Sequence, residues 1–113
     1  MSTKYAFISQ PMNGLSDEEI LNTLMKADDA VRKAGYETIS SFFKPEDKEK
    51  HKETITNVAG ANAVNESVGY LGRSIILLST CKAAYFCKGW ENARGCVIEH
   101  EICEKYGIKI LSD

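Results

Sequence analysis

The fold expected for this chain is decided by residues 83–101, AAYFCKGWENARGCVIEHE. The apolar run Ala83–Cys87 is typical of a short strand inside a parallel sheet. A helical pattern then starts at Arg94 or Gly95, continues to about Tyr106 and is ended by Gly107. A loop that joins a strand to a helix in this way is where open α/β sheets bind ligands.

The first 40 residues predict a strand, a helix and a second strand. Lys4–Gln10 is rich in β-forming residues, and Tyr36–Ser40 alternates between apolar and polar residues. Between them, Ser16 and Glu19 have the spacing of a capping box, and Gly35 stops the helical pattern. Such a unit predicts two parallel strands joined by a right-handed crossover.

The rest of the chain continues the alternation of helices and strands. From about Glu66 a stripe predicts a well-buried helix, and Lys109–Leu111 predicts a last strand. Residues 42–53 suggest a solvated helix or an ordered lid with an exposed His51, and residues 54–65 are expected to be mainly loop. The order predicts one α/β domain over residues 1–113, with a doubly wound sheet of about four or five strands. The stripe of the helix comprises Val68, Leu71, Ile75 and Leu78, widened by Ile76 and Leu77.

Composition excludes several classes of protein. The 113 residues carry a net charge of −2 and 43% hydrophobic residues, with a pI near 5.7, which gives no footprint of nucleic-acid binding. No run approaches the roughly 20 apolar residues of a membrane span. The N-terminus lacks the pattern of a signal peptide, so a cytoplasmic protein is expected.

The four cysteines are expected to be buried thiols rather than metal ligands or disulfides. None of them forms a C-x-x-C pair, and a chain without a secretory signal rarely keeps disulfides. Cys96 and Cys103 are seven residues apart and therefore share one helical face. The other two are Cys81 and Cys87.

Two loops are expected to meet at the carboxyl ends of the strands, namely residues 9–14 and 88–95. Neither contains a dinucleotide fingerprint or a Walker-type loop, so redox chemistry with NAD and hydrolysis of NTP lack support. Glu99, in the first turns of the helix, is the candidate nucleophile, since a carboxylate can attack an anomeric carbon. The alternative is that Glu99, like Glu101 and Glu104, is an ordinary solvated helix acid.

Three further side chains each have a functional and a structural interpretation. Trp90 can stack on a nucleobase or a sugar, or it is a rim aromatic. Arg94, at the helix N-terminus, can bind a phosphate, or it forms a surface salt bridge. His100 is a proton shuttle, half of a metal site with Cys96, or a plain helix histidine.

The two loops resemble a known family. FISQPMNG, residues 7–14, looks like the YISGPMTG opening of nucleoside 2-deoxyribosyltransferase-like proteins. GWENARGCVIEHE, residues 89–101, looks like the GWEKSRGARIEHEIA segment of the small bacterial and phage branch of that superfamily. The resemblance covers the first 40 and about the last 45 residues, in the same order.

The resemblance implies a flavodoxin-like or Rossmann-like three-layer sandwich and an enzyme of the N-glycosidic bond. Relatives cleave deoxynucleosides or their 5′-monophosphates through a glutamate in a G-x-x-x-E pattern, which corresponds here to Gly95–Glu99. Glu99 thereby takes the nucleophile role, with no metal or other cofactor. A homodimer or larger homo-oligomer is implied, without nucleic-acid or membrane partners. The expected contacts to the nucleoside or nucleotide are Ser9, Gln10, Met12, Gly14, Gly89, Trp90, Asn92 and Arg94.

The chain departs from the family pattern at four positions. Phe7 replaces a tyrosine that helps to set the nucleophile. Lys82 and Ser74 stand where aspartates are frequent, and Ala93 replaces a serine that can meet a phosphate. The missing tyrosine and aspartates favour the alternative function, a non-catalytic protein that binds a nucleotide in the same crevice. An oligomeric accessory protein is the other alternative.

Overall fold

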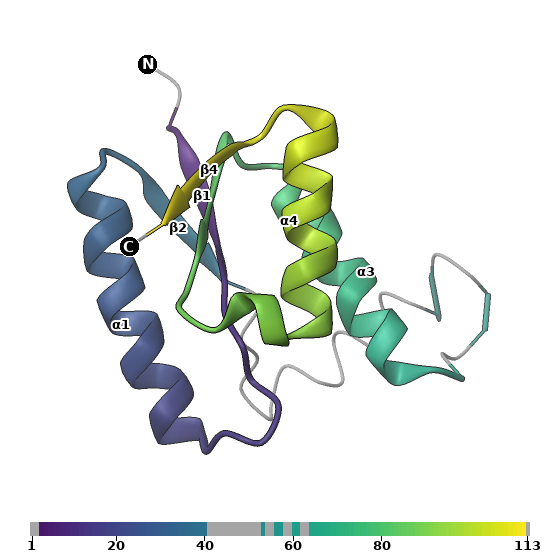
Figure 1. Ribbon diagram of the computed structural model, residues 1–113. Coiled ribbons are helices and arrows are strands. Elements are labelled where there is room, and N and C mark those ends of the chain that lie inside the picture. Colours follow the sequence, from purple (N-terminus) through teal and green to yellow (C-terminus); the bar gives the residue numbers. More distant parts are fainter. Residues whose placement is uncertain (1–2, 41–52, 54–55, 58–59, 62–63, 113) are drawn as a thin grey trace.

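A computed structural model of the chain describes residues 3–40, 53, 56–57, 60–61 and 64–112. Strands and helices alternate along it (Figure 1). The elements are β1 (Tyr5–Ser9), α1 (Asp17–Lys33), β2 (Glu37–Ser40), α3 (Glu66–Leu78), β3 (Ala83–Phe86), the 3-10 turn η2 (Trp90–Asn92), α4 (Arg94–Tyr106) and β4 (Lys109–Ser112). The strand and helix positions predicted from these parts of the sequence are confirmed to within one or two residues.

The described strands form one parallel sheet in the order β2-β1-β3-β4. The central pair is β1 and β3, with Phe7 opposite Ala84 and Ile8 opposite Tyr85. Since β2 and β3 lie on opposite sides of β1, the chain adds strands first in one direction and then in the other. The predicted α/β fold with a small parallel sheet is therefore confirmed.

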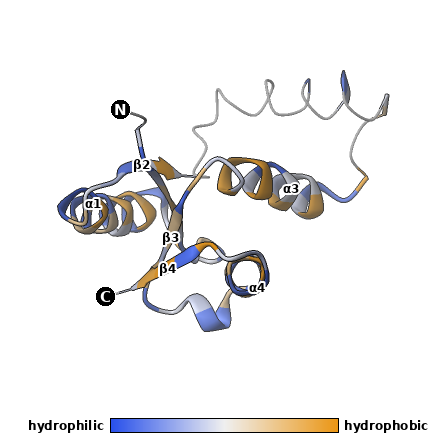
Figure 2. Ribbon diagram, turned by 90° about the horizontal axis from the view of Figure 1, so that it is seen from above, coloured by the Kyte–Doolittle hydropathy of each residue, from blue (hydrophilic) through white to orange (hydrophobic). Residues whose placement is uncertain are grey.

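Helices cover both faces of this sheet (Figure 2). The helix α1 lies on one face, whereas α3 and α4 lie together on the other. On the second face, a Cβ built on Gly95 of α4 would lie 3.9 Å from Leu71 Cδ1 of α3, so the two helices touch. The three layers confirm the sandwich that the resemblance implies.

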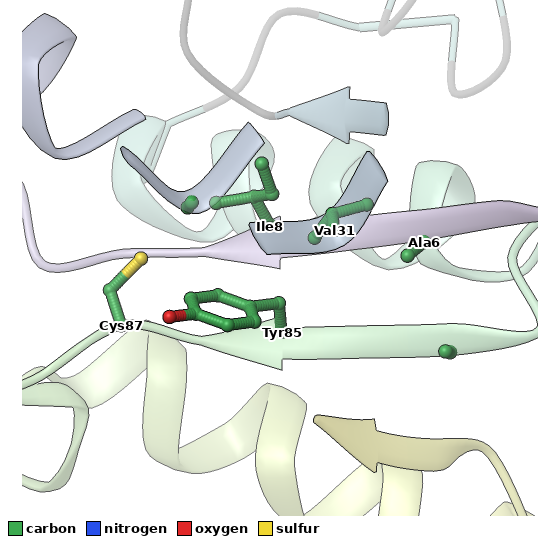
Figure 3. Packing of buried hydrophobic residues seen from close by; sticks show 7 residues of the cluster. Ala6, Ile8, Val31, Tyr85 and Cys87 are labelled. Carbon is green, nitrogen blue, oxygen red and sulfur yellow. The ribbon is translucent and has the colours of Figure 1, made fainter. Parts of the chain in front are cut away.

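Alternation along β1 divides its side chains between two apolar clusters. Ala6 and Ile8 point toward α1, where they pack with Val31 and Tyr85 (Figure 3). Phe7, between them in the sequence, points to the other face and packs with Leu78 and other residues of α3, β3 and α4. Ala6, Phe7 and Ile8 are all fully buried, as expected for a strand inside a parallel sheet.

The start of α1 and the end of α4 lie where local signals in the sequence predict them. Ser16 Oγ accepts from the Glu19 N–H at 3.1 Å and Glu19 Oε1 accepts from the Ser16 N–H at 3.3 Å, which completes the capping box of α1. Gly107 follows α4 with φ of 73°, a left-handed conformation that glycine adopts without strain.

The prediction of a well-buried α3 is wrong. Only Ser74 and Leu78 of this helix are buried, while Val68 and Ile76 are about 60% exposed. For Val68 both ribbon views show the reason, since the N-terminal half of α3 extends away from the sheet (Figures 1 and 2). Apolar periodicity marks the side of a helix that can be covered, but not the length of sheet that is there to cover it.

Part of the middle segment can be compared with expectation. The helix or lid expected over residues 42–53, with His51, lies outside the described residues apart from Glu53. Thr56 and Asn57 are helical, and the Gly60 N–H donates to Thr56 O at 2.8 Å. A short helical turn therefore lies within residues 54–65, a stretch that the sequence predicts to be mainly loop.

None of the helices within the described residues is long and apolar enough to cross a membrane. The expected cytoplasmic location and the expected homo-oligomer stay predictions.

Replacement of Ser16 by alanine should destabilise the protein by about 1 kcal/mol, because the first turn of α1 loses its side-chain acceptor. Urea unfolding measures the change. Asn22→Ala, at an exposed position inside the same helix, is the control and should cost nothing. Equal stabilities of the Ser16→Ala and wild-type proteins would contradict the capping role.

Candidate functional site

The carboxyl ends of β1 and β3 form the candidate site. The chain leaves these neighbouring strands toward helices on opposite faces, which is where open α/β sheets leave a crevice. The two following loops touch: the Cys87 N–H donates to Ser9 O at 3.0 Å, and a Cβ built on Gly89 would lie 3.7 Å from Pro11 Cγ. The predicted meeting of residues 9–14 and 88–95 is thus confirmed.

Glu99 is a buried carboxylic acid at this crevice. Only 5% of the residue is exposed, and Ser9 Oγ donates a hydrogen bond of 2.7 Å to its Oε1 atom. Ser9 is the last residue of β1 and is itself 1% exposed. The solvated helix acid considered as the alternative for Glu99 is therefore wrong, although it holds for Glu101 and Glu104, which are exposed.

Burial changes the acidity of Glu99. Loss of hydration disfavours the charged form and raises the pKa of this carboxyl from 4.5 to about 7, while the hydrogen bond from Ser9 acts in the opposite direction. Among the described residues, no lysine, arginine or histidine forms an ion pair with Glu99. The group can therefore exchange a proton near neutral pH and is free of a salt bridge that would absorb its charge.

Two thiols flank the carboxyl on the same face of α4. Cys96 and Cys103 are 3% and 1% exposed, as the sequence predicts. Burial, with a smaller contribution from the charge of Glu99, raises the pKa of each thiol to about 11. Both thiols are thus protonated at neutral pH, and they enclose Glu99 without competing as nucleophiles.

The first strand supplies the hydroxyl partner of Glu99 from an unexpected position. The deoxyribosyltransferase-like proteins that the sequence resembles have a tyrosine where this chain has Phe7, and Phe7 is fully buried in the core. Ser9 lies two residues further along the same face of β1, next to α4. Its hydroxyl donates to the carboxylate of Glu99, so Glu99 has a donor from β1 although position 7 carries no hydroxyl.

The other predicted contacts of the first loop lie at different depths. Gln10 is buried on the α1 side, where its Nε2 donates to Ile20 O at 3.0 Å and its Oε1 has no partner. Met12 is half-buried and accepts from the Leu15 N–H at 3.1 Å through its carbonyl. Gly14 is exposed with φ of 81°. Gln10 thus ties the loop to α1 and is turned away from Glu99.

The second loop is half-buried at its start and exposed at its end. Gly89 has φ of 89°, which a residue with a side chain rarely adopts, and it begins the turn η2. Asn92 and Arg94 are exposed. Ala93 is the N-cap of α4 and has no side-chain hydrogen bond to the helix. The first N–H groups of α4, which begins at Arg94, therefore have no acceptor from the side chain of the N-cap residue.

Trp90 and His100 form a stacked pair. Their ring centroids are 4.0 Å apart with an interplanar angle of 6°, and Phe86 contacts both rings. His100 is therefore more than the plain helix histidine of the sequence analysis, because its ring packs against Trp90 and Phe86. Within the described residues, no group of three or more His, Cys, Asp or Glu side chains could hold a metal ion.

Two departures from the family pattern lie away from the crevice. Lys82 immediately precedes β3, at the opposite end of the strand from Cys87, and is exposed. Ser74 is buried in α3, where its hydroxyl donates to Tyr70 O at 3.2 Å.

A surface recess lies between α1 and β2, away from Glu99. It is lined by Leu24, Met25, Asp28, Arg32, Thr38 and Ser40.

Sequence reasoning missed the burial of Glu99, although a signal for it was present. Glu99 is three residues after Cys96 and four before Cys103, so it shares the face that those thiols were expected to bury. It also missed Ser9 as the donor to Glu99 and His100 as the partner of Trp90. These two pairs join residues from different elements or turns, and no local pattern announces them.

The Glu99→Gln protein should gain stability over the wild type as the pH rises. The folded protein keeps a proton on Glu99 up to about pH 7, whereas the unfolded chain loses it near 4.5. The stability that this proton contributes is present below pH 4.5 and lost as the pH rises toward 7 and above. Between pH 5 and pH 8 the wild type should lose roughly 2 to 3 kcal/mol relative to Glu99→Gln.

Urea unfolding of both proteins at the two pH values measures this difference. Glutamine is neutral at both and can still accept from Ser9, so the comparison isolates the charge. Glu101→Gln, on the exposed side of α4, is the matched control and should show no such change. A difference between wild type and Glu99→Gln that stays constant with pH would contradict the raised pKa.

Comparison with known proteins places the chain in a family. The model of the family described as Domain of unknown function (DUF4406) matches residues 4–112, which include both strands and both loops of the crevice. No curated protein and no solved structure matches the chain. Because the match spans nearly every residue, the chain belongs to the family Domain of unknown function (DUF4406).

Proposed function

We propose that the protein cleaves the N-glycosidic bond of deoxyribonucleosides or deoxyribonucleoside 5′-monophosphates, by transfer of the 2-deoxyribosyl group or by hydrolysis. The observation that carries the proposal is the buried carboxyl of Glu99 at the crevice between β1 and β3. A carboxyl without a salt bridge is costly to bury, and such groups concentrate where chemistry requires them.

Glu99 acts as the nucleophile. Its carboxylate attacks C1′ of the sugar while the C1′–N bond breaks, and the bonding electrons leave with the base, which takes up a proton. The product is an ester between Glu99 and C1′. Water or a second base then attacks C1′, and Glu99 is released as a carboxylate. Water completes a hydrolysis, and a second base completes a transfer.

Ser9 orients the carboxylate for this attack. Its hydrogen bond to Oε1 fixes one oxygen, which leaves Oε2 as the atom that attacks. The nearly complete burial of Glu99 removes the water that would otherwise solvate and weaken the nucleophile. Orientation and desolvation are the two properties that turn a common helix acid into a reactive one.

The loops supply the remaining contacts. Gly89 and Met12 border the crevice, where the base and sugar would lie, with Trp90 beside them. Arg94 and the first N–H groups of α4 are the candidates for a 5′-phosphate, since both favour anions. The resemblance of residues 7–14 and of Gly95–Glu99 to deoxyribosyltransferase-like proteins supports the same substrate class.

Incubation with the four deoxynucleosides and their 5′-monophosphates, with and without a free acceptor base, should release base or form an exchanged nucleoside. Liquid chromatography detects either product. Glu99→Gln should lose at least about 1,000-fold in rate, because the nucleophile is gone. Glu101→Gln, two residues away and exposed, should keep wild-type activity.

The covalent intermediate gives a second, independent readout. A 2-deoxy-2-fluoro nucleoside should slow the second step, so that the mass of the protein increases by one sugar on the peptide that contains Glu99. A label on another residue, or full activity of Glu99→Gln, would end this mechanism.

The pH profile of kcat/KM should report the same group. The attacking form is the carboxylate, so the rate should rise about tenfold per pH unit below pH 7 and level off above it. Activity of the wild type from pH 5 to pH 9 on one substrate measures the profile. A rate that falls above pH 7 would mean that Glu99 donates a proton as a general acid instead.

A second candidate function is a non-catalytic nucleotide-binding protein. The raised pKa of Glu99 favours it, because about half of the carboxyls hold a proton at pH 7 and can donate a hydrogen bond to a bound base. Thermal shifts with nucleotides, without any product after long incubation, would support this candidate over the enzyme.

A further inference from the structure

The indole of Trp90 is held by rings from β3 and α4. The imidazole of His100 lies parallel to it, with the centroids 4.0 Å apart, and the Phe86 ring lies at a tilt, 5.6 Å away. Phe86 also meets the edge of His100, at 4.8 Å and an angle of 66°. Such contacts between rings stabilise the cluster beyond the effect of the area that they bury.

His100 is itself fixed on α4. Its Nδ1 lies 3.2 Å from Glu104 Oε1, one turn later on the helix. A carboxylate can only accept, so Nδ1 carries the proton in this bond. The side chain of His100 is 20% exposed and that of Glu104 is 62% exposed. The helix thus sets the plane of the imidazole, and the imidazole sets the plane of the indole.

The loop that carries Trp90 also contacts the core, because Trp90 packs against the apolar cluster that contains Phe7, Leu78 and Phe86. The turn η2 itself contains no buried residue, and its backbone hydrogen bonds are local, from the N–H groups of Trp90, Asn92 and Ala93 to carbonyls three residues back. Local bonds preserve the shape of a turn, but they do not fix where the turn lies relative to the rest of the site.

We propose that His100 is a positioning residue that holds Trp90, and with it the turn η2, as one wall of the crevice. The proposal deepens the proposed function, on which its substrate arm rests. Glu99 and His100 are adjacent on α4, so one helix fixes both the reacting carboxyl and the wall beside it. Because His100 covers one face of the indole, a nucleobase that stacks on Trp90 has only the opposite face.

The test uses the fact that Trp90 is the single tryptophan of the chain, so its fluorescence reports this wall alone. His100→Leu keeps an apolar side chain of similar bulk but removes the flat ring, and His100→Phe keeps the ring. In His100→Leu, the constant for acrylamide quenching of Trp90 should rise at least about twofold, because the indole moves more freely. His100→Phe should restore the wild-type value, with circular dichroism as the control for folding.

Turnover provides the substrate arm. With a nucleotide that the wild type converts, His100→Leu should raise KM about fivefold at nearly constant kcat, because a stacking surface for the base is lost while Glu99 is untouched. His100→Phe should return KM to within about twofold of the wild type. A general loss of stability would lower kcat as well and would not be rescued by phenylalanine.

In the fluorescence experiment, two results would overturn the proposal. One is an unchanged quenching constant in His100→Leu, and the other is an equal rise of this constant in His100→Leu and His100→Phe, which would mean that the flat ring does not hold the indole. In the turnover experiment, a change in kcat without a change in KM would contradict the role of Trp90 as a wall of the crevice. Failure of the wild type to turn over any nucleotide would count against the proposed function, while the fluorescence comparison would still decide the role of His100.

Discussion

The pairing of β1 with β3 is the constraint on which the rest of the structure depends. These two strands are the centre of the sheet, and nearly all their side chains are buried. In the sheet, β2 lies on one side of β1 and β3 on the other, so the direction in which successive strands follow one another reverses at β1. With right-handed crossovers, this reversal places α1 on one face and α3 and α4 on the other. The loops after β1 and β3 therefore lead to helices on opposite faces of the sheet, and they meet at the candidate site.

The same geometry explains why Glu99 is buried. The helix α4 must cover the sheet with one face, and Cys96, Glu99 and Cys103 are the residues of that face that are buried. Two of them are apolar enough for this position, whereas a carboxyl loses its hydration there. Ser9 returns only one hydrogen bond. The raised pKa of Glu99 reflects this loss of hydration. Proteins accept such a free-energy cost where a site needs a reactive group.

Different faces of α4 serve different purposes. The buried face carries Glu99 toward β1, and the next residue, rotated by about 100° around the helix, places His100 against Trp90. The more exposed face holds surface pairs such as Glu101 with Lys105, at 3.8 Å. The helix thereby relates the carboxyl and the loop to each other rigidly, which loop residues alone could not achieve.

Short-range signals in the sequence predicted most of the fold. Ser16 and Glu19, Gly35 and Gly107 fixed the helix ends because capping acts over three or four residues. The apolar run Ala83–Cys87 marked a strand whose own residues are all buried. The motif around Gly95–Glu99 also located the candidate site. Apolar periodicity failed for α3, because the N-terminal half of this helix, with Val68, extends past the sheet that would have covered it.

What the sequence by itself determined was therefore the order and type of the elements and the identity of Glu99 as a candidate, since these depend on spacing along the chain. Only the tertiary structure decided that Glu99 is buried while Glu101 is not, that Ser9 rather than residue 7 is its donor, and that His100 stacks on Trp90. Each of these depends on which face of a helix meets which end of a strand. That meeting is set by the sheet order, and contacts between residues up to 90 positions apart leave no periodic trace in the sequence.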